Sequence, residues 1–428
     1  MRKFTFVLIG LIALVACEAE LETERANNLG NENVLSRNGS TISPDAAAAL
    51  AVEFRNSILN QSGQTRGKIN EKGVASVYAW RSSEIASKTT TRSTASDLLP
   101  DTLLYIVNFE DSCGFALVSA DAQIADVAAY VEKGMLTPDQ EIENPGFKSF
   151  LEGYEEYARG IRDSTRKIAD SLLTIDTLKY DKINNPFIGD EFDFTSVHDV
   201  YQLVYFVAPL LTTEWGQDIP YNLYCPGYRL AGCVAIAIAQ ITAFYRYPSS
   251  YNNHVYEWDK MLQANQINNH IDSIRYSAAN LVYDIAELVY TRYGYNMSTA
   301  NFNNVPHCWE ALGYHYDELR NVDFGTIRTN IGNGNPIFMR GRVPGEDIGH
   351  AWVVDGIAVK RHKHASLLSI PDRKYIHCNW GWNGNCNGYF ILGAFEKKYD
   401  LETDYGVSGY NAYNENIWIY HNIYPFNN

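Results

Sequence analysis

The chain has 428 residues, of which 46% are hydrophobic and 20% are charged. This composition excludes an intrinsically disordered protein and supplies enough apolar residues for two or three domains. The 50 acidic residues outnumber the 35 basic residues and give a formal net charge of −15, which argues against nucleic acid or an anionic membrane surface as a partner.

The N-terminus has the features of an export signal. Arg2 and Lys3 precede an apolar run over residues 4 to 15, which is too short to span a membrane. Cys17 follows with a leucine and an alanine at the positions typical of a bacterial lipobox. We expect residues 1 to 16 to be a signal peptide and Cys17 to be lipidated. The alternative is a plain secretory signal with an incidental cysteine. An exported lipoprotein of the outer membrane or cell surface is expected, attached to the membrane only by its lipid, with a larger C-terminal part that processing can release.

The next two segments differ in composition. Residues 17 to 42 are polar and predict a flexible tether. Residues 43 to 160 predict a small α+β domain. Its expected elements are a helix that has Ser43 as N-cap, begins at Pro44 and continues to Ile58, two strands within 102–119 around a turn at 110–112, a strand within 125–131, and a helix over 147–173.

A charged segment over residues 161 to 195 predicts an exposed linker that contains a processing site. Residues 196 to 428 are rich in Tyr, Trp, Gly and Asn and predict a second, larger domain. Its expected elements are helices over 232–245 and 281–293 and strands over 336–341, 350–359, 375–380 and 388–392. Helices followed by strands favour an α+β fold over a wound parallel sheet.

Cys233 is the strongest candidate for chemistry. It opens an apolar helix directly after Gly232. A helix N-terminus presents unpaired amide donors and a positive dipole end, which favour a thiolate. The alternative for this residue alone is a buried cysteine that acts as a small hydrophobic side chain.

His350 is the candidate base because it begins an apolar strand after Gly349. A thiolate nucleophile needs an imidazole that takes its proton and later gives it to the leaving amine. The alternative is a structural histidine at a strand start. Asn379 is placed to accept a hydrogen bond from the imidazole, and Trp380 is placed to shield that bond from water.

Three further residues complete the candidate site. The amide of Gln217 and the backbone N–H of Cys233 are expected to bind a developing oxyanion. Trp382 and Gly349 are candidates for the walls of the cleft, and Gly349 ends a glycine-bearing loop that begins at residue 341 and is suited to hinge motion.

Together these residues resemble the streptopain family of papain-like bacterial cysteine peptidases. The matching motifs, in chain order, are Gly216-Gln217 with Pro220-Tyr221-Asn222, Gly232-Cys233-Val234-Ala235 with Ala239-Gln240-Ile241, Gly349-His350-Ala351 with Asp355-Gly356, and Asn379-Trp380-Gly381-Trp382. The resemblance implies Cys233 as nucleophile, His350 as base, Gln217 in the oxyanion hole, and Asn379 with Trp380 supporting the histidine. It also implies that residues 43 to 160 are an inhibitory propeptide domain and residues 196 to 428 a papain-like catalytic domain.

The expected function is therefore a secreted cysteine endopeptidase made as a zymogen, with proteins or peptides as substrates, its own propeptide as inhibitor and no cofactor. The alternatives are a non-catalytic surface-binding lipoprotein and a papain-like cell-wall amidase, because one fold serves several functions. Two features depart from the family pattern: the basic insertion over residues 360 to 364, and extra thiols near the expected cleft. Cys378 and Cys386 are candidates for a disulfide or, with His377, for a metal site of unusual spacing, and the states of Cys225 and Cys308 are open.

Overall fold

The computed structural model describes residues 42–62, 73–81, 102–121, 124, 127–174, 201–267, 272–342, 349–363, 371–395 and 417–426. Cys17, the signal peptide and nearly all of the tether lie outside these ranges, as does most of the loop before His350. None of the helices in the described ranges is both long and apolar enough to cross a membrane. We refer to residues 42–174 as the N-terminal unit and to residues 201–426 as the C-terminal unit.

Within its described residues, the N-terminal unit contains two helices and four strands. Helix α2 begins as predicted, because the Ser43 side chain accepts a hydrogen bond from the Ala46 N–H at 3.1 Å and caps the helix. Strand β1 was not predicted. The elements are α2 (Pro44–Gln61), β1 (Val74–Arg81), β2 (Thr102–Phe109), β3 (Phe115–Ser119), β4 (Val127–Val131) and α5 (Pro145–Thr174), with a 3₁₀ turn at Glu110–Ser112.

The C-terminal unit places its helices mainly before its central strands, as predicted. The helices are α6 (Cys233–Tyr245), α7 (Trp258–Met261), α8 (Asp272–Leu288), α9 (Val305–Ala311) and α10 (Phe324–Gly332). The strands are β5 (Tyr201–Val207), β6 (Ser250–Tyr251), β7 (His254–Val255), β8 (Tyr314–Arg320), β9 (Ile337–Arg342), β10 (Gly349–His362), β11 (Arg373–Asn379), β12 (Gly388–Ile391) and β13 (Trp418–Pro425). Further 3₁₀ turns lie at Pro226–Tyr228, Phe302–Asn304 and Leu392–Ala394.

One antiparallel sheet joins the two units. Its order is β1-β2-β3-β4-β12-β11-β10-β9-β13-β8, and β5 pairs with the second half of β10. The junction is the pairing of β4 with β12, where Gly388 lies opposite Val131. A Cβ atom at Gly388 would lie 2.1 Å from the carbonyl oxygen of Tyr130, so the close approach of the two strands requires glycine here. The α+β class is confirmed, but its two parts share a single sheet.

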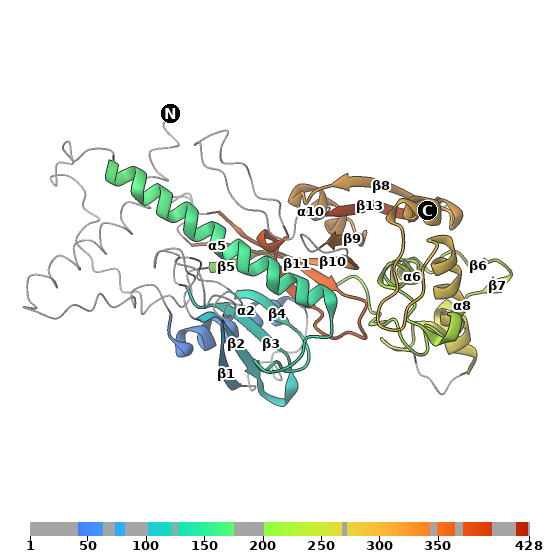
Figure 1. The fold of residues 1–428 in the computed structure, drawn as a ribbon, viewed down its shortest axis with the longest axis horizontal. Coiled ribbons are helices and arrows are strands. Elements are labelled where there is room, and N and C mark those ends of the chain that lie inside the picture. Colours follow the sequence, from blue (N-terminus) through green and yellow to red (C-terminus); the bar gives the residue numbers. More distant parts are fainter. Residues whose placement is uncertain are drawn as a thin grey trace, which may run out of the picture.

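The sheet separates two hydrophobic cores. The first contains α2, the start of α5, strands β2 to β4 and one face of the C-terminal sheet, including Trp352 and Trp380. The second lies on the other face, where Ala351 and Val353 pack with α6, α8 and α9. Figure 1 shows α5 running across the sheet while α6 and α8 are grouped to the right, apart from α2 and β1. The N-terminal unit therefore shares its core with the C-terminal unit.

The predicted basic insertion is in part a continuation of β10, which extends to His362. Lys360 is 2% exposed, and its Nζ donates to Glu53 Oε2 of α2 at 2.7 Å. A buried ammonium is tolerated when a carboxylate lies this close. The first residue of the insertion thus contacts the N-terminal unit.

Candidate active site

Cys233 is the first residue of α6, as predicted from its place at the start of an apolar run. Gly232 precedes it with φ 96°, and α6 is buried along most of its length. Burial raises the pKa of the Cys233 thiol, while the backbone N–H groups of Ala351, Val234 and Cys233 itself act against that rise. The sulfur therefore lies against the helix N-terminus and against the residue that follows His350 on β10.

His350 is the second residue of β10 and is 3% exposed. Its Nε2 lies 2.8 Å from the carbonyl oxygen of Trp380. Because a carbonyl can only accept, Nε2 carries the hydrogen, and Nδ1 is the nitrogen that can take up a proton. Burial lowers the pKa of His350 to about 4, although the Trp380 carbonyl opposes this change. The imidazole is therefore neutral at pH 7 in this structure.

The predicted partner of the imidazole is corrected by these contacts. The Asn379 side-chain oxygen accepts from Gln240 Nε2 at 3.1 Å and from the Gly381 N–H at 3.2 Å. Its Nδ2 donates to the Thr213 carbonyl at 2.7 Å. The His350 ring instead packs beside the indole of Trp380. Consecutive residues of a strand point to opposite faces of the sheet. The Asn379 amide lies on the face that carries Gln240 of α6. The imidazole of His350 therefore bonds to the backbone carbonyl of the next residue, Trp380, and not to the Asn379 side chain.

The segment of Gln217 is brought next to the nucleophile. Gln217 is 6% exposed, and its carbonyl accepts from the Ala231 N–H at 2.9 Å, two residues before Cys233. Asn383 Nδ2 donates to Asp218 Oδ1 at 2.8 Å. These contacts hold the Gln217 segment between the start of α6 and the loop that follows Trp380.

The two predicted cleft residues, Trp382 and Gly349, lie on either side of the imidazole in the chain, one after Trp380 and one before His350. Trp382 is half-buried and packs against the core shared by the two units. Gly349 is exposed and pairs with Arg342 of β9, next to His350.

Cys378 and Cys386 are free thiols, so the disulfide considered for them does not form. Within the described ranges, no group of three His, Cys, Asp or Glu side chains is placed to hold a metal ion.

The start of α5 lies directly on the candidate base. A Cβ atom built on Gly146 would lie 2.3 Å from Trp380 Cε3 and 2.7 Å from His350 Cδ2. Asn144 Nδ2 donates to the carbonyl of Asn385 at 2.8 Å. Phe150 packs edge-on against Phe390, with ring centroids 4.8 Å apart. The N-terminal unit thus covers the imidazole. Sequence patterns did not single out Gly146, because its importance depends on a neighbour 204 residues away, from 146 to 350.

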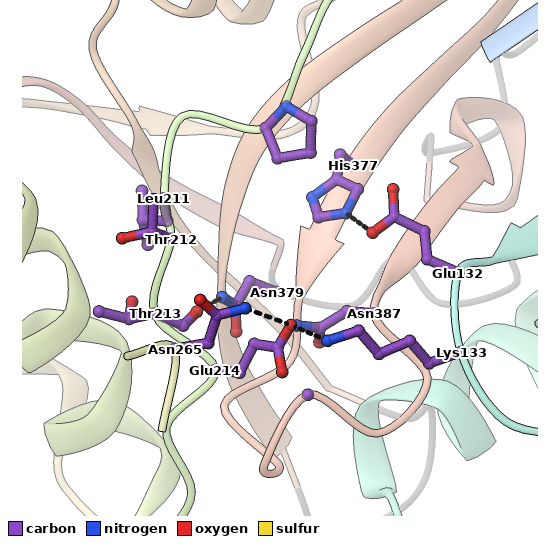
Figure 2. Close-up of a pocket in the computed structure, with 12 residues that line it drawn as sticks. Glu132, Lys133, Leu211, Thr212, Thr213, Glu214, Asn265, His377, Asn379 and Asn387 are labelled. Atoms are coloured by element: carbon purple, nitrogen blue, oxygen red, sulfur yellow. Dashed lines mark hydrogen bonds and ion pairs between the residues drawn. The ribbon is translucent and has the colours of Figure 1, made fainter. Parts of the chain in front are cut away.

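A cavity of about 150 Å³ lies between the units, and the Asn379 side chain forms part of its wall (Figure 2). Its wall combines residues of the turn after β4 with residues of the C-terminal unit. It is lined by Glu132, Lys133, Pro209, Leu211, Thr212, Thr213, Glu214, Asn265, His377, Asn379, Gly384 and Asn387.

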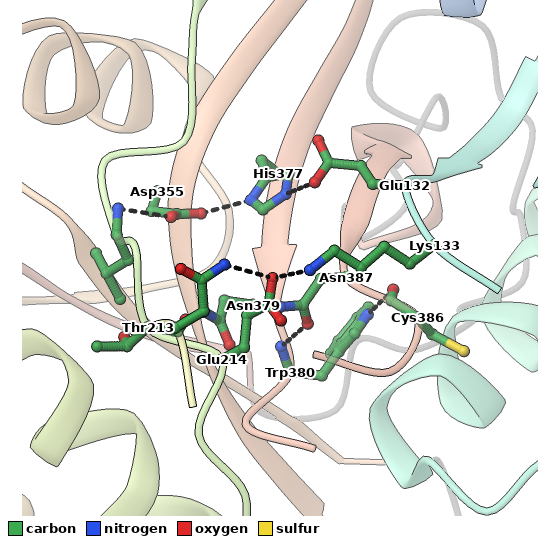
Figure 3. Close-up of polar contacts among 12 residues, drawn as sticks. Glu132, Lys133, Thr213, Glu214, Asp355, His377, Asn379, Trp380, Cys386 and Asn387 are labelled. Carbon is green, nitrogen blue, oxygen red and sulfur yellow. Dashed lines mark hydrogen bonds and ion pairs between the residues drawn. The ribbon is translucent and has the colours of Figure 1, made fainter. Parts of the chain in front are cut away.

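A charge network centred on the buried His377 and Asp355 crosses the units beside this cavity (Figure 3). His377 Nδ1 lies 2.6 Å from Asp355 Oδ1, and its Nε2 lies 3.7 Å from Glu132 Oε2. Burial alone lowers the pKa of His377, but the two carboxylates outweigh burial and raise it to about 10. Burial raises the pKa of Glu132, whereas His377 and Lys133 lower it, and the result is a lowered value. A second pair joins Lys133 to Glu214. These contacts, which the sequence analysis missed, fasten the N-terminal unit to the C-terminal unit.

Two known protein families match the chain, one in the C-terminal unit and one in the N-terminal unit. Residues 215–390 match the Peptidase C10 family, and residues 39–158 match the Spi protease inhibitor family. Streptopain of Streptococcus pyogenes is 23% identical over 358 residues, which cover 72% of this chain and 78% of streptopain. The thiol protease/hemagglutinin PrtT of Porphyromonas gingivalis is 22% identical over 360 residues, or 73% of this chain and 36% of that protein.

Among solved structures, a fragment of prointerpain A from Prevotella intermedia matches with a TM-score of 0.51 and 21% identity, covering 77% of this chain and 98% of the fragment. This likeness supports the predicted fold, a papain-like peptidase part preceded by a small α+β propeptide domain. The predicted resemblance to the streptopain family is thus confirmed for both parts of the chain: a region similar to C10 peptidases is preceded by a region similar to the Spi protease inhibitor.

Proposed function

We propose that the chain is the zymogen of a cysteine endopeptidase that cleaves peptide bonds through Cys233 and His350. The observation that carries the proposal is the placement of the Cys233 sulfur against the α6 N-terminus and the backbone of Ala351, the residue next to His350. The family matches to C10 peptidases support the same chemistry.

In this mechanism, Nδ1 of His350 takes the proton from the Cys233 thiol, and the thiolate attacks the carbonyl carbon of the scissile bond. The oxyanion accepts hydrogen bonds from the Cys233 N–H and the Gln217 amide. The tetrahedral intermediate collapses when His350 gives its proton to the leaving amine. Water, deprotonated by His350, then hydrolyses the thioester and restores the thiol.

The simplest test compares residues 18–428 with the same chain carrying Cys233→Ala, following self-processing and casein cleavage. Equal cleavage by both proteins would refute the catalytic assignment. Activity on cell-wall peptides without activity on casein would favour the amidase alternative instead.

We also propose that the N-terminal unit inhibits this site until it is removed. The contact of Gly146 with His350 and Trp380 supports this proposal, because it packs the N-terminal unit closely against the imidazole. The shared sheet and the ion pairs of Glu132, Lys133 and Glu53 hold the unit in this position.

Gly146→Val is expected to raise the activity of the unprocessed chain toward a small peptide roughly tenfold or more, because overpacking a tight contact costs about 1–3 kcal/mol. The measurement is the initial rate before any processing is visible on a gel. Lys148→Val is the matched control, since it places the same side chain at an exposed position in the first turn of α5. Equal rates for both variants would contradict inhibition through this contact.

Acid is expected to weaken the closed zymogen. Burial lowers the pKa of His350 to about 4, against about 6.5 for a solvated imidazole. Protons therefore bind the opened or unfolded chain more tightly between pH 6.5 and pH 4, and stability is lost as pH falls through that window. The loss amounts to about 3 kcal/mol at most. Denaturant unfolding of the Cys233→Ala chain between pH 7 and pH 4, compared with a chain that also carries His350→Gln, measures it. Identical pH dependence of the two chains would contradict the prediction.

We propose, finally, that the protein is exported and lipid-anchored at Cys17. The basic residues, short apolar run and lipobox-like cysteine at the N-terminus support this proposal. Mass spectrometry of the mature N-terminus checks it, and an unmodified cysteine there would exclude the anchor.

A further inference from the structure

Gln240 is a buried amide on the helix that carries the nucleophile. It lies two turns after Cys233 on α6 and is 0% exposed. Its Oε1 accepts from the Trp215 N–H at 3.1 Å, and its Nε2 donates to Asn379 Oδ1 at 3.1 Å. Both ends of the amide are therefore bonded to other segments of the chain.

The two partners lead to the two loops that complete the site. Trp215 precedes Gln217 by two residues, and Asn379 precedes Trp380, whose carbonyl holds Nε2 of His350. Gln240 is thus the point at which the nucleophile helix, the Gln217 segment and the support of His350 are joined by side-chain hydrogen bonds.

The orientation of each amide in this network is dictated by the backbone. The Asn379 oxygen must face the Gly381 N–H, and its Nδ2 must face the Thr213 carbonyl. Asn379 therefore presents an acceptor to Gln240, and the Trp215 N–H presents a donor. Only a side chain with one acceptor and one donor at fixed spacing satisfies both, which is the property of a glutamine amide.

Burying an amide in an apolar helix is unfavourable unless its hydrogen bonds are made. The neighbours of Gln240 from Val234 to Ile241 are apolar and buried. A leucine or methionine would fill the same volume without that cost. The hydrogen bonds of Gln240 therefore offset the cost of burying its amide. They lead to the two loops that carry Gln217 and Trp380.

We propose that Gln240 is a positioning residue that holds the Gln217 segment and the Trp380 carbonyl in register with Cys233. The inference rests on the proposed peptidase function. It assigns Gln240 no contact with the substrate. Its effect is to keep the oxyanion donor and the imidazole in the geometry that the tetrahedral intermediate requires.

Two variants of the full chain, matured by processing, test the role. Gln240→Met keeps the volume and removes both hydrogen bonds. We expect it to lower kcat per titrated active site about 100-fold, as for a catalytic group displaced by about 1 Å, with KM within about threefold of the wild-type value. Active sites are counted with an irreversible thiol reagent, so unfolded protein does not enter the kcat.

Gln240→Glu supplies a readout that a purely structural role would not produce. The carboxylate still accepts from the Trp215 N–H but cannot donate to the Asn379 oxygen, whereas the protonated carboxyl can do both. We expect kcat of this variant to fall as pH rises through the pKa of residue 240, a step that the wild-type enzyme lacks. Thr242→Val is the control, since Thr242 is equally buried on α6 and its side-chain hydroxyl donates to the Ala239 carbonyl within the helix.

Wild-type kcat in Gln240→Met, or a Gln240→Glu profile without the added step, would overturn the inference. A loss of kcat in Thr242→Val equal to that in Gln240→Met would do so as well, because it would reduce the effect to helix stability. If wild-type cleavage does not depend on Cys233, the proposed function has failed, and that outcome is recognised before any Gln240 variant is compared.

Discussion

Replacing Cys233 with alanine is expected to lower kcat/KM for peptide cleavage by on the order of 10⁵-fold or more, because no other group in the site can form the acyl intermediate. The change removes one sulfur from a partly exposed position at the start of α6. Fold and propeptide contacts should persist, so thermal unfolding should stay close to that of the unaltered chain. Kinetics on a fluorogenic peptide after removal of the N-terminal unit give the ratio.

Cys386→Ala is the matched control for this experiment. Cys386 is also a partly exposed free thiol of the C-terminal unit, and burial raises its pKa as it does that of Cys233. Unlike Cys233, it does not begin a helix, and its backbone carbonyl accepts from Trp380 Nε1 at 2.9 Å. Its variant should keep near-normal activity. Comparable losses in both variants would mean that the assignment of Cys233 as the nucleophile is wrong.

His350→Gln is expected to reduce kcat by about 10⁴-fold, since a positioned general base contributes roughly 10²–10⁴-fold and the thiolate also loses its partner. The glutamine amide can still donate to the Trp380 carbonyl, so the packing of the site is kept while the proton acceptor is lost. Alkylation of Cys233 should then follow the titration of an unassisted thiol at higher pH. The measurement is the pH dependence of the alkylation rate.

His254→Gln controls for the general effect of removing an imidazole. His254 Nδ1 lies 2.8 Å from Asp284 Oδ2, away from the catalytic loops. Its variant should show a normal pH profile. An unchanged alkylation profile in His350→Gln would remove His350 from the mechanism.

Much of the fold could be predicted where local pattern and tertiary environment agree. The α6 helix, the Ser43 cap and strands β9 to β12 follow from apolar runs, glycines and capping residues. The helix predicted over 281–293 was wrong in its bounds, because α8 begins at the polar residue Asp272. It ends before Tyr290, which has φ 54°.

Strands β8 and β13 could not be predicted because they form by pairing with each other, and a local sequence pattern does not reveal such a partner. The sequence of β8 is Tyr-His-Tyr-Asp-Glu-Leu-Arg and is largely polar. It is an edge strand that pairs with β13, about a hundred residues later in the chain. An edge strand needs fewer apolar residues than a central one, so alternation is weak.

The site was predicted as a set of residue types and missed as a set of contacts. Cys233 and His350 carry chemistry in their side chains, so a sequence displays them. The acceptor for His350 is the backbone carbonyl of Trp380. Every residue has such a carbonyl, so the sequence does not mark it. Glu132 and His377 meet only because β4 pairs with β12. Contacts of these kinds depend on tertiary structure and leave no mark in a local pattern.

The pairing of β4 with β12 makes maturation a problem of solubility as well as of inhibition. If processing removes the N-terminal unit, β12 loses its neighbour along Gly388, Tyr389 and Phe390, and the aromatic face that packs against Phe147 and Phe150 meets water. A newly exposed edge strand beside an apolar patch promotes association with other chains. In the precursor, the N-terminal unit shields this strand edge and aromatic face from water. After processing, they remain exposed to solvent unless another surface covers them.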